Sequence, residues 1–426
     1  MKRVINSLIP FVVFLVLYLA IGIYLTFKGE EFAFYKFPAP TCALIGFGAA
    51  LIIGWRDLHG HVSTFVRGIK EDTVILMCLI FMLAGAFAAV TKAMGGVDAT
   101  VNMGLAVLPG RLILPGIFMI ACFISMAMGT SMGTIGAVTP IAVGLAAKAG
   151  LPLPITMGAV LGGAMFGDNL SVISDTTIAA TSTQGCRMRD KMIMNAKIAI
   201  PAAIVVTILL AVFSKPAQLN GDFEFSFIRT LPYLTVISLA ILGVHVVGVL
   251  MIGIALAAII GIAAGSFTFV DFGGEVYQGF LSMAEVFFLT VLVAGLAGMA
   301  SEQGGLGWVL GKFWKLIRGK RSAEIGMAGL VSIADVCTAN NTVAIIISGK
   351  MAKNIAQKFA IAPRRVASVL DIFSCVWQGV LPYGAQLLLI GGLAKVSPFK
   401  VIPYAWYPMA LAVAGTAAII FKFPRK

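Results

Sequence analysis

The sequence predicts an all-α polytopic membrane protein, and three observations carry this prediction. The chain has 426 residues, of which 60% are hydrophobic and only 12% are charged, far from the composition of an average soluble domain. Apolar runs long enough to cross a bilayer, or nearly so, recur along the chain. The same order of segments occurs twice. We therefore expect about eleven transmembrane helices in two inverted repeats, each with a re-entrant hairpin and a broken helix.

The apolar runs are the candidate spans. The first follows a basic start, as in a signal peptide, but it is about 20 residues long and no small-x-small site closes it, so we interpret it as a retained span. The run at 232–265 is long for one helix and short for two, which makes the total ten to twelve. The runs are 8–27, 39–54, 72–94, 112–126, 156–180, 191–213, 232–265, 283–303, 323–336, 366–393 and 398–422.

The charges indicate lipid rather than nucleic acid as the partner. The formal net charge is +13, but Lys and Arg occur in short clusters between apolar runs, such as 187–191 and 350–365, where they would contact anionic head groups. No GxxxxGK[ST] motif is present, so ATP-driven coupling within this chain is not expected. The six cysteines lie without metal-ligand spacing and are interpreted as small core residues. No cofactor is expected.

Matching segments divide the chain into a first repeat, 1–220, and a second, 221–426. AGAFAAVTKAMGG at 84–96 resembles AGLAGMASEQGG at 294–305, about 209 residues later. GTSMGTIGAVTPIA aligns with CTANNTVAIIISGK at about 208, and MFGDNLSV aligns with CVWQGVLP at about 210. These alignments put Thr130 opposite Thr338 and Asp168 opposite Gln378.

Each half is expected to contain the same parts. Hairpins are predicted at about 122–150 and 336–362, broken helices at about 156–180 and 366–393, and amphipathic surface helices at 95–111 and 306–321. Interrupted apolar segments at matching positions indicate a transport site, because unwound backbone can line a cavity but cannot face lipid. The charge distribution does not decide whether the repeats are inverted; we favour inversion because opposed hairpins suit alternating access. The alternative is duplication without a shared mechanism.

The segment FGDNLSVISDTT, residues 166–177, carries two acids in an apolar setting. A carboxylate at the bilayer centre costs about 2.5–3.5 kcal/mol, so it needs compensation. In a helix, three of the polar residues would share one face, and an unwound backbone would add carbonyl oxygens. Such hard oxygens suit Na⁺ or a proton; the alternative is a polar cluster that holds helices together. The candidates are Asp168, Asn169, Ser171, Ser174, Asp175 and Thr176, with Asp168 and Asp175 as Na⁺ ligands.

The two hairpin tips and the second broken helix supply the remaining candidates. GTSMGT and TANNT carry small, hydroxyl and amide residues, and helix N-termini there can contact an ion or solute. Close helix packing is the alternative interpretation. In SVLDIFSCVWQGVLPYGAQ, Pro382 and two glycines interrupt a helix rich in polar residues. The candidates are Thr130, Ser131 and Thr134, then Thr338, Asn340, Asn341 and Thr342, then Asp371, Gln378 and Tyr383, with Asp335 as a further intramembrane acid.

The first polar segment resembles the signature GD-x-x-S-x-x-SDTT of NhaC-type sodium/proton antiporters in the ion transporter superfamily. Residues Gly167, Asp168, Ser171 and Ser174 to Thr177 are in register with it. The resemblance implies an inverted-repeat transporter with two re-entrant hairpins that exchanges Na⁺ for H⁺. The second half departs from the pattern, because WQGVLPYGAQ stands where many members have a PWN-like element, and the family also includes carriers of organic acids and amino acids.

Two functions follow as hypotheses, and neither is an enzyme. The first is Na⁺/H⁺ exchange across the cytoplasmic (inner) membrane, in which Asp168 and Asp175 alternately hold protons and cations. The second is Na⁺- or H⁺-coupled transport of a small organic acid or amino acid, in which Thr130, Ser131 and Asn340 with its neighbour Asn341 bind the solute. A channel or scaffold is a third class. The expected partners are the bilayer and small ions or solutes, and the sequence leaves a homodimer open.

Overall fold

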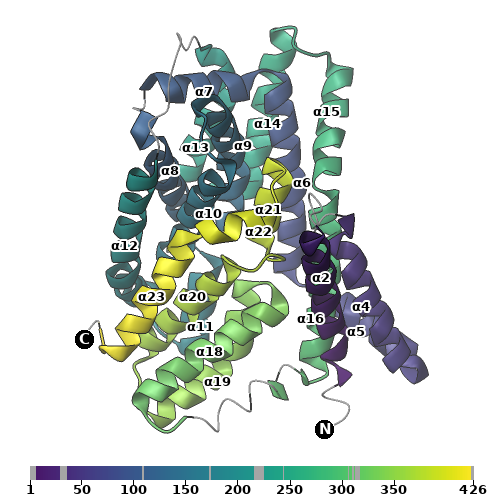
Figure 1. The fold of residues 1–426 in the computed structure, drawn as a ribbon, viewed down its shortest axis with the longest axis vertical. Coiled ribbons are helices and arrows are strands. Elements are labelled where there is room, and N and C mark those ends of the chain that lie inside the picture. Colours follow the sequence, from purple (N-terminus) through teal and green to yellow (C-terminus); the bar gives the residue numbers. More distant parts are fainter. Residues whose placement is uncertain are drawn as a thin grey trace.

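The computed structural model describes residues 6–28, 36–107, 110–171, 174–214, 225–242, 244–305, 307–308, 311 and 317–423. Every regular element in these ranges is a helix, so the all-α prediction is confirmed for this part of the chain (Figure 1). The helices of the first half are α2 (Ile9–Phe27), α4 (Ala39–Ile53), α5 (Leu58–Ile69), α6 (Asp72–Ala93), α7 (Gly96–Val107), α8 (Ile113–Met128), α9 (Ser131–Ala149), α10 (Leu153–Leu170), α11 (Asp175–Gln184) and α12 (Met188–Phe213). Those of the second half are α13 (Phe227–Ile241), α14 (Val246–Ala263), α15 (Phe269–Ser282), α16 (Ala284–Glu302), α18 (Lys320–Thr338), α19 (Asn341–Lys358), α20 (Pro363–Gln378), α21 (Ala385–Ala394), α22 (Pro398–Val401) and α23 (Trp406–Ile420).

Fewer helices have the length and hydropathy of a membrane span than the apolar runs predicted. Among the described residues five qualify, in α6, α9, α12, α14 and α16, and two helix pairs bent by 83° and 101° raise the number to seven. The predicted total of about eleven is therefore not confirmed. Several of the apolar runs form shorter helices, such as Trp406–Ile420, and hydropathy alone does not separate a spanning helix from a buried one. The ambiguous run at 232–265 forms two helices, α13 and α14.

Both predicted hairpin tips are present, but the first arm of each hairpin begins earlier than predicted. Helix α8 ends at Gly129, a left-handed residue with φ +68°, and α9 begins directly after Thr130. Helix α18 ends at Ala339, with φ +52°, and α19 begins after its N-cap Asn340. The runs 112–126 and 323–336, which we predicted as separate spans, are thus the first arms of the two hairpins. Apolar arms of this length look like spans in the sequence because hydropathy does not register the tight turn that follows.

Both predicted helix breaks are also present. In the first half α10 ends at Leu170 and α11 begins at Asp175; in the second half α20 ends at Gln378 and α21 begins at Ala385. The starts of these helices follow one register of 210 residues, as for Leu153 and Pro363 and for Asp175 and Ala385. This register pairs Thr130 with Asn340, two residues away from the predicted partner Thr338.

The predicted surface features are only partly where we expected them. Lys191 and Arg365, which we assigned to head-group clusters, are 0% and 8% exposed. They form ion pairs with Asp371 and Glu324, at 2.8 Å each. In the sequence, a basic residue near the start of a helix resembles a surface anchor. In the structure, tertiary contacts bury both of these side chains in the interior. The surface helix predicted at 95–111 contains α7, and half of the one predicted at 306–321 lies outside the described residues.

The arrangement puts the broken helices in the middle of the molecule. In Figure 1, α10, α20 and α21 lie between α12 on one flank and the group of α2, α4 and α5 on the other, while the hairpin α18–α19 forms the lower end. Large apolar side chains are exposed on the flanks, for example Val12 and Val16 on α2 and Ile208 and Val212 on α12. An outward apolar surface of this kind suits contact with lipid.

Candidate functional site

A small cavity lies where the two hairpin tips and the two helix breaks converge. Its volume is about 50 Å³. Helix α6 completes its wall with apolar side chains, and the other lining residues come from the four segments that the sequence singled out. The lining residues are Leu76, Met77 and Ile80 of α6; Gly129, Thr130, Ser131 and Met132 of the first tip; Asp168, Ser174, Asp175 and Thr176 of the first broken helix; Asn340, Asn341 and Thr342 of the second tip; and Gln378 and Gln386 of the second broken helix.

Asp168 is held at the positive end of a helix. It lies near the end of α10, is 4% exposed, and its Oδ1 accepts a hydrogen bond of 3.0 Å from the backbone N–H of Ser131, the first residue of α9. The N-terminus of a helix favours a negative charge because its N–H groups are unpaired and the helix dipole is positive there. Thr176 closes the break by donating its hydroxyl to the Asp168 carbonyl oxygen at 3.0 Å. The carboxylate is thereby fixed in direction.

Close packing of α8 against α10 supports this geometry. Ser125 donates its hydroxyl to the carbonyl oxygen of Ala164 at 2.5 Å. At Gly167 a Cβ atom would overlap both the side chain and the backbone of Ser125. Only glycine therefore allows α8 to approach α10 one residue before Asp168, and this brings the first hairpin tip onto the carboxylate.

Asp175 enters the cavity from the other side of the break. It is the first residue of α11 and its side chain is exposed. The neighbouring hydroxyls of Ser174 and Thr176 are 2.9 Å apart and form a hydrogen bond. None of the residues that line the cavity carries a positive charge, so the two acids there face hydroxyl and amide groups. Carboxylate and hydroxyl oxygens of this kind suit a hard cation such as Na⁺, or protons, rather than a thiophilic metal.

A chain of side-chain amides connects the two hairpin tips across the cavity. Gln386 donates to the Ser131 hydroxyl at 3.1 Å, and Gln378 donates both to Gln386 Oε1 at 2.6 Å and to the Ala339 carbonyl at 3.2 Å. Two buried amide atoms of the lining, Asn341 Nδ2 and Gln378 Oε1, have no hydrogen-bond partner in the described part of the chain. Since buried polar groups are normally paired, these atoms are free to bind a water molecule or a solute.

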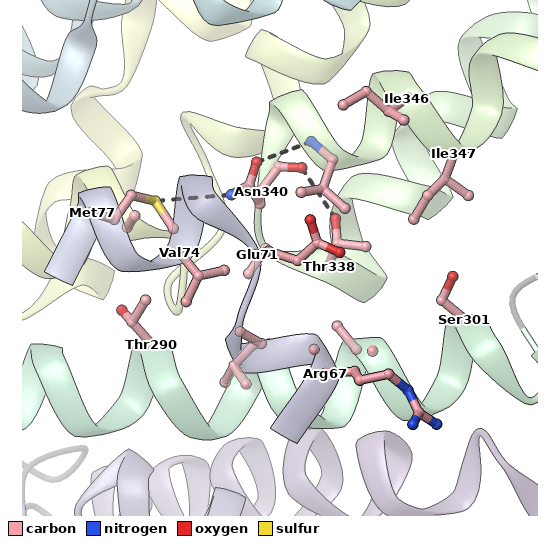
Figure 2. A pocket seen from close by; sticks show the side chains of 18 of the residues that line it. Arg67, Glu71, Val74, Met77, Thr290, Ser301, Thr338, Asn340, Ile346 and Ile347 are labelled. Carbon is pink, nitrogen blue, oxygen red and sulfur yellow. Dashed lines mark hydrogen bonds between the residues drawn. The ribbon is translucent and has the colours of Figure 1, made fainter. Parts of the chain in front are cut away.

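A larger cavity, which we call the vestibule, adjoins the small one. Its volume is about 360 Å³, and it extends from the ion pair of Arg67 and Glu302 to the second hairpin tip (Figure 2). Met77 and Asn340 line both cavities, and Asn340 Nδ2 contacts Met77 Sδ at 3.9 Å, as the dashed line in Figure 2 marks. This contact is therefore the partition between the vestibule and the small cavity.

The structure places Asp371 outside the cavity. Its carboxylate is 0% exposed and forms an ion pair with Lys191 at 2.8 Å, and Asn195 donates to it at 2.6 Å. Lys191 also donates to the Asn169 carbonyl at 3.1 Å and to the Thr177 hydroxyl at 2.8 Å. The pair thus ties α12 and α20 to the end of α10, behind the break.

The other candidates divide into two groups. Thr338 and Tyr383 line the vestibule and not the small cavity. Asn169, Ser171 and Thr134 are buried beside the site without lining it, as is Asp335 in α18.

Sequence reasoning missed Lys191, Asn195 and Met77 and did not select Gln386. The spacing of Lys191 and Asn195 by one helical turn on α12 was an available signal. Met77 had no comparable signal in the sequence, because a single methionine in an apolar helix is common.

Comparison with known proteins gives a consistent assignment. The sequence pattern described as the Na⁺/H⁺ antiporter family matches residues 3–215 and 196–423. The malate-2H⁺/Na⁺-lactate antiporter of Bacillus subtilis is 23% identical over 96% of this chain and 94% of its own. The Na⁺/H⁺ antiporter NhaC of Alkalihalophilus pseudofirmus is 24% identical over 87% and 86%, and the arginine/ornithine antiporter ArcD of Halobacterium salinarum is 22% identical over 82% and 78%.

Two solved structures are similar in part. The YdaH transporter of Alcanivorax borkumensis shares 15% identity, with a TM-score of 0.46 over 86% of this chain and 90% of that one. The MtrF protein of Neisseria gonorrhoeae shares 12% identity, with a TM-score of 0.42 over 85% and 83%.

Proposed function

The chain belongs to the Na⁺/H⁺ antiporter family, and from this premise we propose that it exchanges Na⁺ for H⁺ across the cytoplasmic membrane by alternating access. Membership makes it a multi-pass membrane protein and a secondary transporter rather than an enzyme. Its relatives carry different solutes, so the choice of Na⁺ and H⁺ rests on the site itself.

The observation that carries the proposal is the size and lining of the small cavity. A volume of about 50 Å³ exceeds the roughly 10–15 Å³ that one water molecule needs. It therefore has room for a Na⁺ ion with a few waters, and it is well below the roughly 300–1,000 Å³ of typical small-molecule pockets. Two carboxylates, Asp168 and Asp175, share this space without a cationic side chain in the lining.

Exchange follows from competition for the same oxygens. When Asp168 and Asp175 are ionised, their charge favours Na⁺, with the Ser174 and Thr176 hydroxyls as neighbouring oxygen donors. When protons bind, the negative charge is lost and Na⁺ leaves. Because ionised and empty carboxylates are costly to enclose in a low-dielectric interior, a conformational change is favoured only with Na⁺ or protons bound. Loading by one or the other in turn gives exchange.

The two hairpins supply the alternating access in this proposal. The second tip, at Asn340, borders the vestibule, whereas the first tip, at Ser131, lies only against the small cavity. The 210-residue register supports treating the two hairpin and broken-helix units as repeats, and we propose that they are inverted. In the state described here ions would enter through the vestibule past Met77 and Asn340; the opposite state would open beside the first tip.

The test is Na⁺-dependent proton movement in proteoliposomes that contain a pH dye. We expect Asp168→Asn and Asp175→Asn to abolish exchange because an amide cannot alternate between a proton and a cation. Asp98→Asn is the matched control, since Asp98 is 73% exposed and pairs with Lys148 on the surface. Wild-type rates in both cavity variants, with correct membrane insertion, would refute the proposal.

One observation favours a second candidate, the coupled transport of a small organic acid or amino acid. The vestibule has the volume typical of small-molecule pockets, about 300–1,000 Å³, and it ends at the polar residues Thr338 and Asn340. Uptake of labelled malate, lactate, arginine and ornithine into the same vesicles, driven by a Na⁺ gradient, separates the two candidates. Uptake that Asn340→Ala removes would favour the second; Na⁺/H⁺ exchange without any such uptake would favour the first.

A further inference from the structure

Asp335 is a buried carboxyl group that the proposed exchange at the small cavity does not use. It lies in α18, one helical turn before the second hairpin tip, and is 0% exposed. Among the described residues neither of its carboxylate oxygens has a hydrogen-bond partner of standard geometry, although the backbone N–H of Gln378 interacts with the carboxyl group, and it forms no ion pair. It lines neither the small cavity nor the vestibule.

Packing does not explain an acid at this position. In the 210-residue register Asp335 corresponds to Ser125, whose hydroxyl pins the first hairpin to the Ala164 carbonyl of α10. The residue that corresponds to Ala164 is Ser374, and its hydroxyl donates instead to the Asp371 carbonyl at 3.0 Å. Asp335 therefore does not repeat the hydrogen bond of Ser125, although the backbone N–H of Gln378 in α20 interacts with its carboxyl group. A serine at this position would fill the place with one polar oxygen instead of two.

The surroundings of Asp335 require it to be neutral in this conformation. Helix α18 packs against α16, α19, α20 and α23, and no Lys, Arg or His of their described residues pairs with Asp335. The ionisable side chains near it are Cys375 of α20 and Tyr383 in the helix break, with Cys337 two residues further along α18. None of these is a cation at neutral pH. A buried carboxylate without a counter-charge binds a proton instead of remaining ionised.

Tyr383 links the vestibule wall to the segment of α18 that carries Asp335. Thr338, Ala339 and Tyr383 line the vestibule, and the Tyr383 hydroxyl donates to the carbonyl oxygen of Val336, the residue after Asp335, at 2.7 Å. Along α18, Asp335 is thus one helical turn away from residues that line the vestibule. A displacement of the second hairpin that breaks this hydrogen bond would bring water to Asp335.

We propose that Asp335 is a second proton-carrying site, separate from the small cavity and reached through the vestibule when Tyr383 and the second hairpin move. The carboxyl group takes up a proton from water on one side and releases it to water on the other, so each cycle moves one more proton than the cavity acids alone. This inference rests on the proposed Na⁺/H⁺ exchange.

The first test measures the coupling ratio, the number of protons exchanged per Na⁺, in proteoliposomes. It is obtained from the pH gradient at which net exchange stops against a fixed Na⁺ gradient at clamped membrane potential. We expect Asp335→Asn to exchange with one proton fewer per Na⁺ than wild type. Asp335→Ser, which copies the first hairpin, should show the same reduced ratio. Ser332→Ala is the matched control on α18, because its hydroxyl bonds only to the Ala328 carbonyl of its own helix, and its ratio should equal wild type. An unchanged ratio in an active Asp335 variant would overturn the proposal.

The second test does not depend on transport. Infrared spectroscopy of the wild-type protein in lipid should show a protonated carboxyl band at neutral pH that is absent from Asp335→Asn and present in Ser332→Ala. The band should also disappear at alkaline pH in the presence of a Na⁺ gradient that drives turnover. No difference between wild type and Asp335→Asn, or a band that never titrates, would overturn the proton-carrying role. Wild-type protein without any Na⁺/H⁺ exchange would instead refute the proposed function, whatever the infrared result.

Discussion

The ion pair of Lys191 and Asp371 provides the sharpest test of how burial governs this fold. Both side chains are 0% exposed and their charged atoms are 2.8 Å apart. We consider the replacement Lys191→Met, which keeps the length of the side chain and removes its charge. Asp371 is then left buried without its counter-charge, although Asn195 still donates a hydrogen bond to it. The variant should be markedly less stable than wild type.

The expected loss can be worked from the contacts. Removing one partner of a buried ion pair costs about 3–5 kcal/mol, because the other charge remains in a low-dielectric interior. The double replacement Lys191→Met with Asp371→Leu should recover most of this. Asn195 Nδ2 would still donate to the Asn169 carbonyl at 3.0 Å, and Thr177 would still donate to the Ser171 carbonyl at 2.9 Å. The remaining deficit should be about 1–2 kcal/mol for lost hydrogen bonds.

The assay is unfolding of the purified proteins in the same detergent, followed as the free energy of unfolding or the apparent melting temperature. The control is Glu302→Gln. Its pair with Arg67 is closer, with N and O atoms 2.5 Å apart, but the two side chains are 53% and 48% exposed. Solvent screens such a pair, so we expect no measurable change in stability.

Two results would refute this reasoning. If Lys191→Met were as stable as wild type, Asp371 would not depend on its counter-charge. If the double variant were no more stable than Lys191→Met, the loss would come from the packing of α12 and not from an unpaired buried charge.

Two further predictions concern the approach of the hairpins and the partition between the cavities. Gly167→Ala should destabilise the protein by about 1–3 kcal/mol through overpacking and reduce exchange, because the new Cβ overlaps Ser125. The control is Gly248→Ala, whose Cβ would meet only a side-chain atom at 3.7 Å. Equal effects of the two variants in thermal unfolding would contradict the argument. Met77→Ala should widen the opening beside Asn340, so that K⁺ inhibits Na⁺/H⁺ exchange more strongly than in wild type; an unchanged K⁺ inhibition curve would show that Met77 does not restrict access.

Local patterns determined much of the site. The polar run around Asp168, the small and amide residues at the tips, and the glycines and Pro382 in the second broken helix all stand out against an apolar chain. The helices are interrupted in these segments, and the segments line one cavity; their role in binding stays a prediction. These signals can be recognised because backbone breaks and unpaired polar groups are costly in an apolar interior. Residues that cause them are therefore rare in apolar segments and are noticeable in a short stretch of sequence.

Only the tertiary structure decided which polar groups face each other. The sequence alone did not separate Asp175, which lines the cavity, from Asp371, which is neutralised by Lys191, because both acids lie in polar stretches of interrupted helices. It also made Lys191 look like a head-group anchor and the hairpin arms look like spans. Hydropathy and turn preference depend on residues that are neighbours in the sequence. Burial and charge pairing arise only when segments from the two halves of the chain come into contact, and the packing of the whole molecule determines that contact.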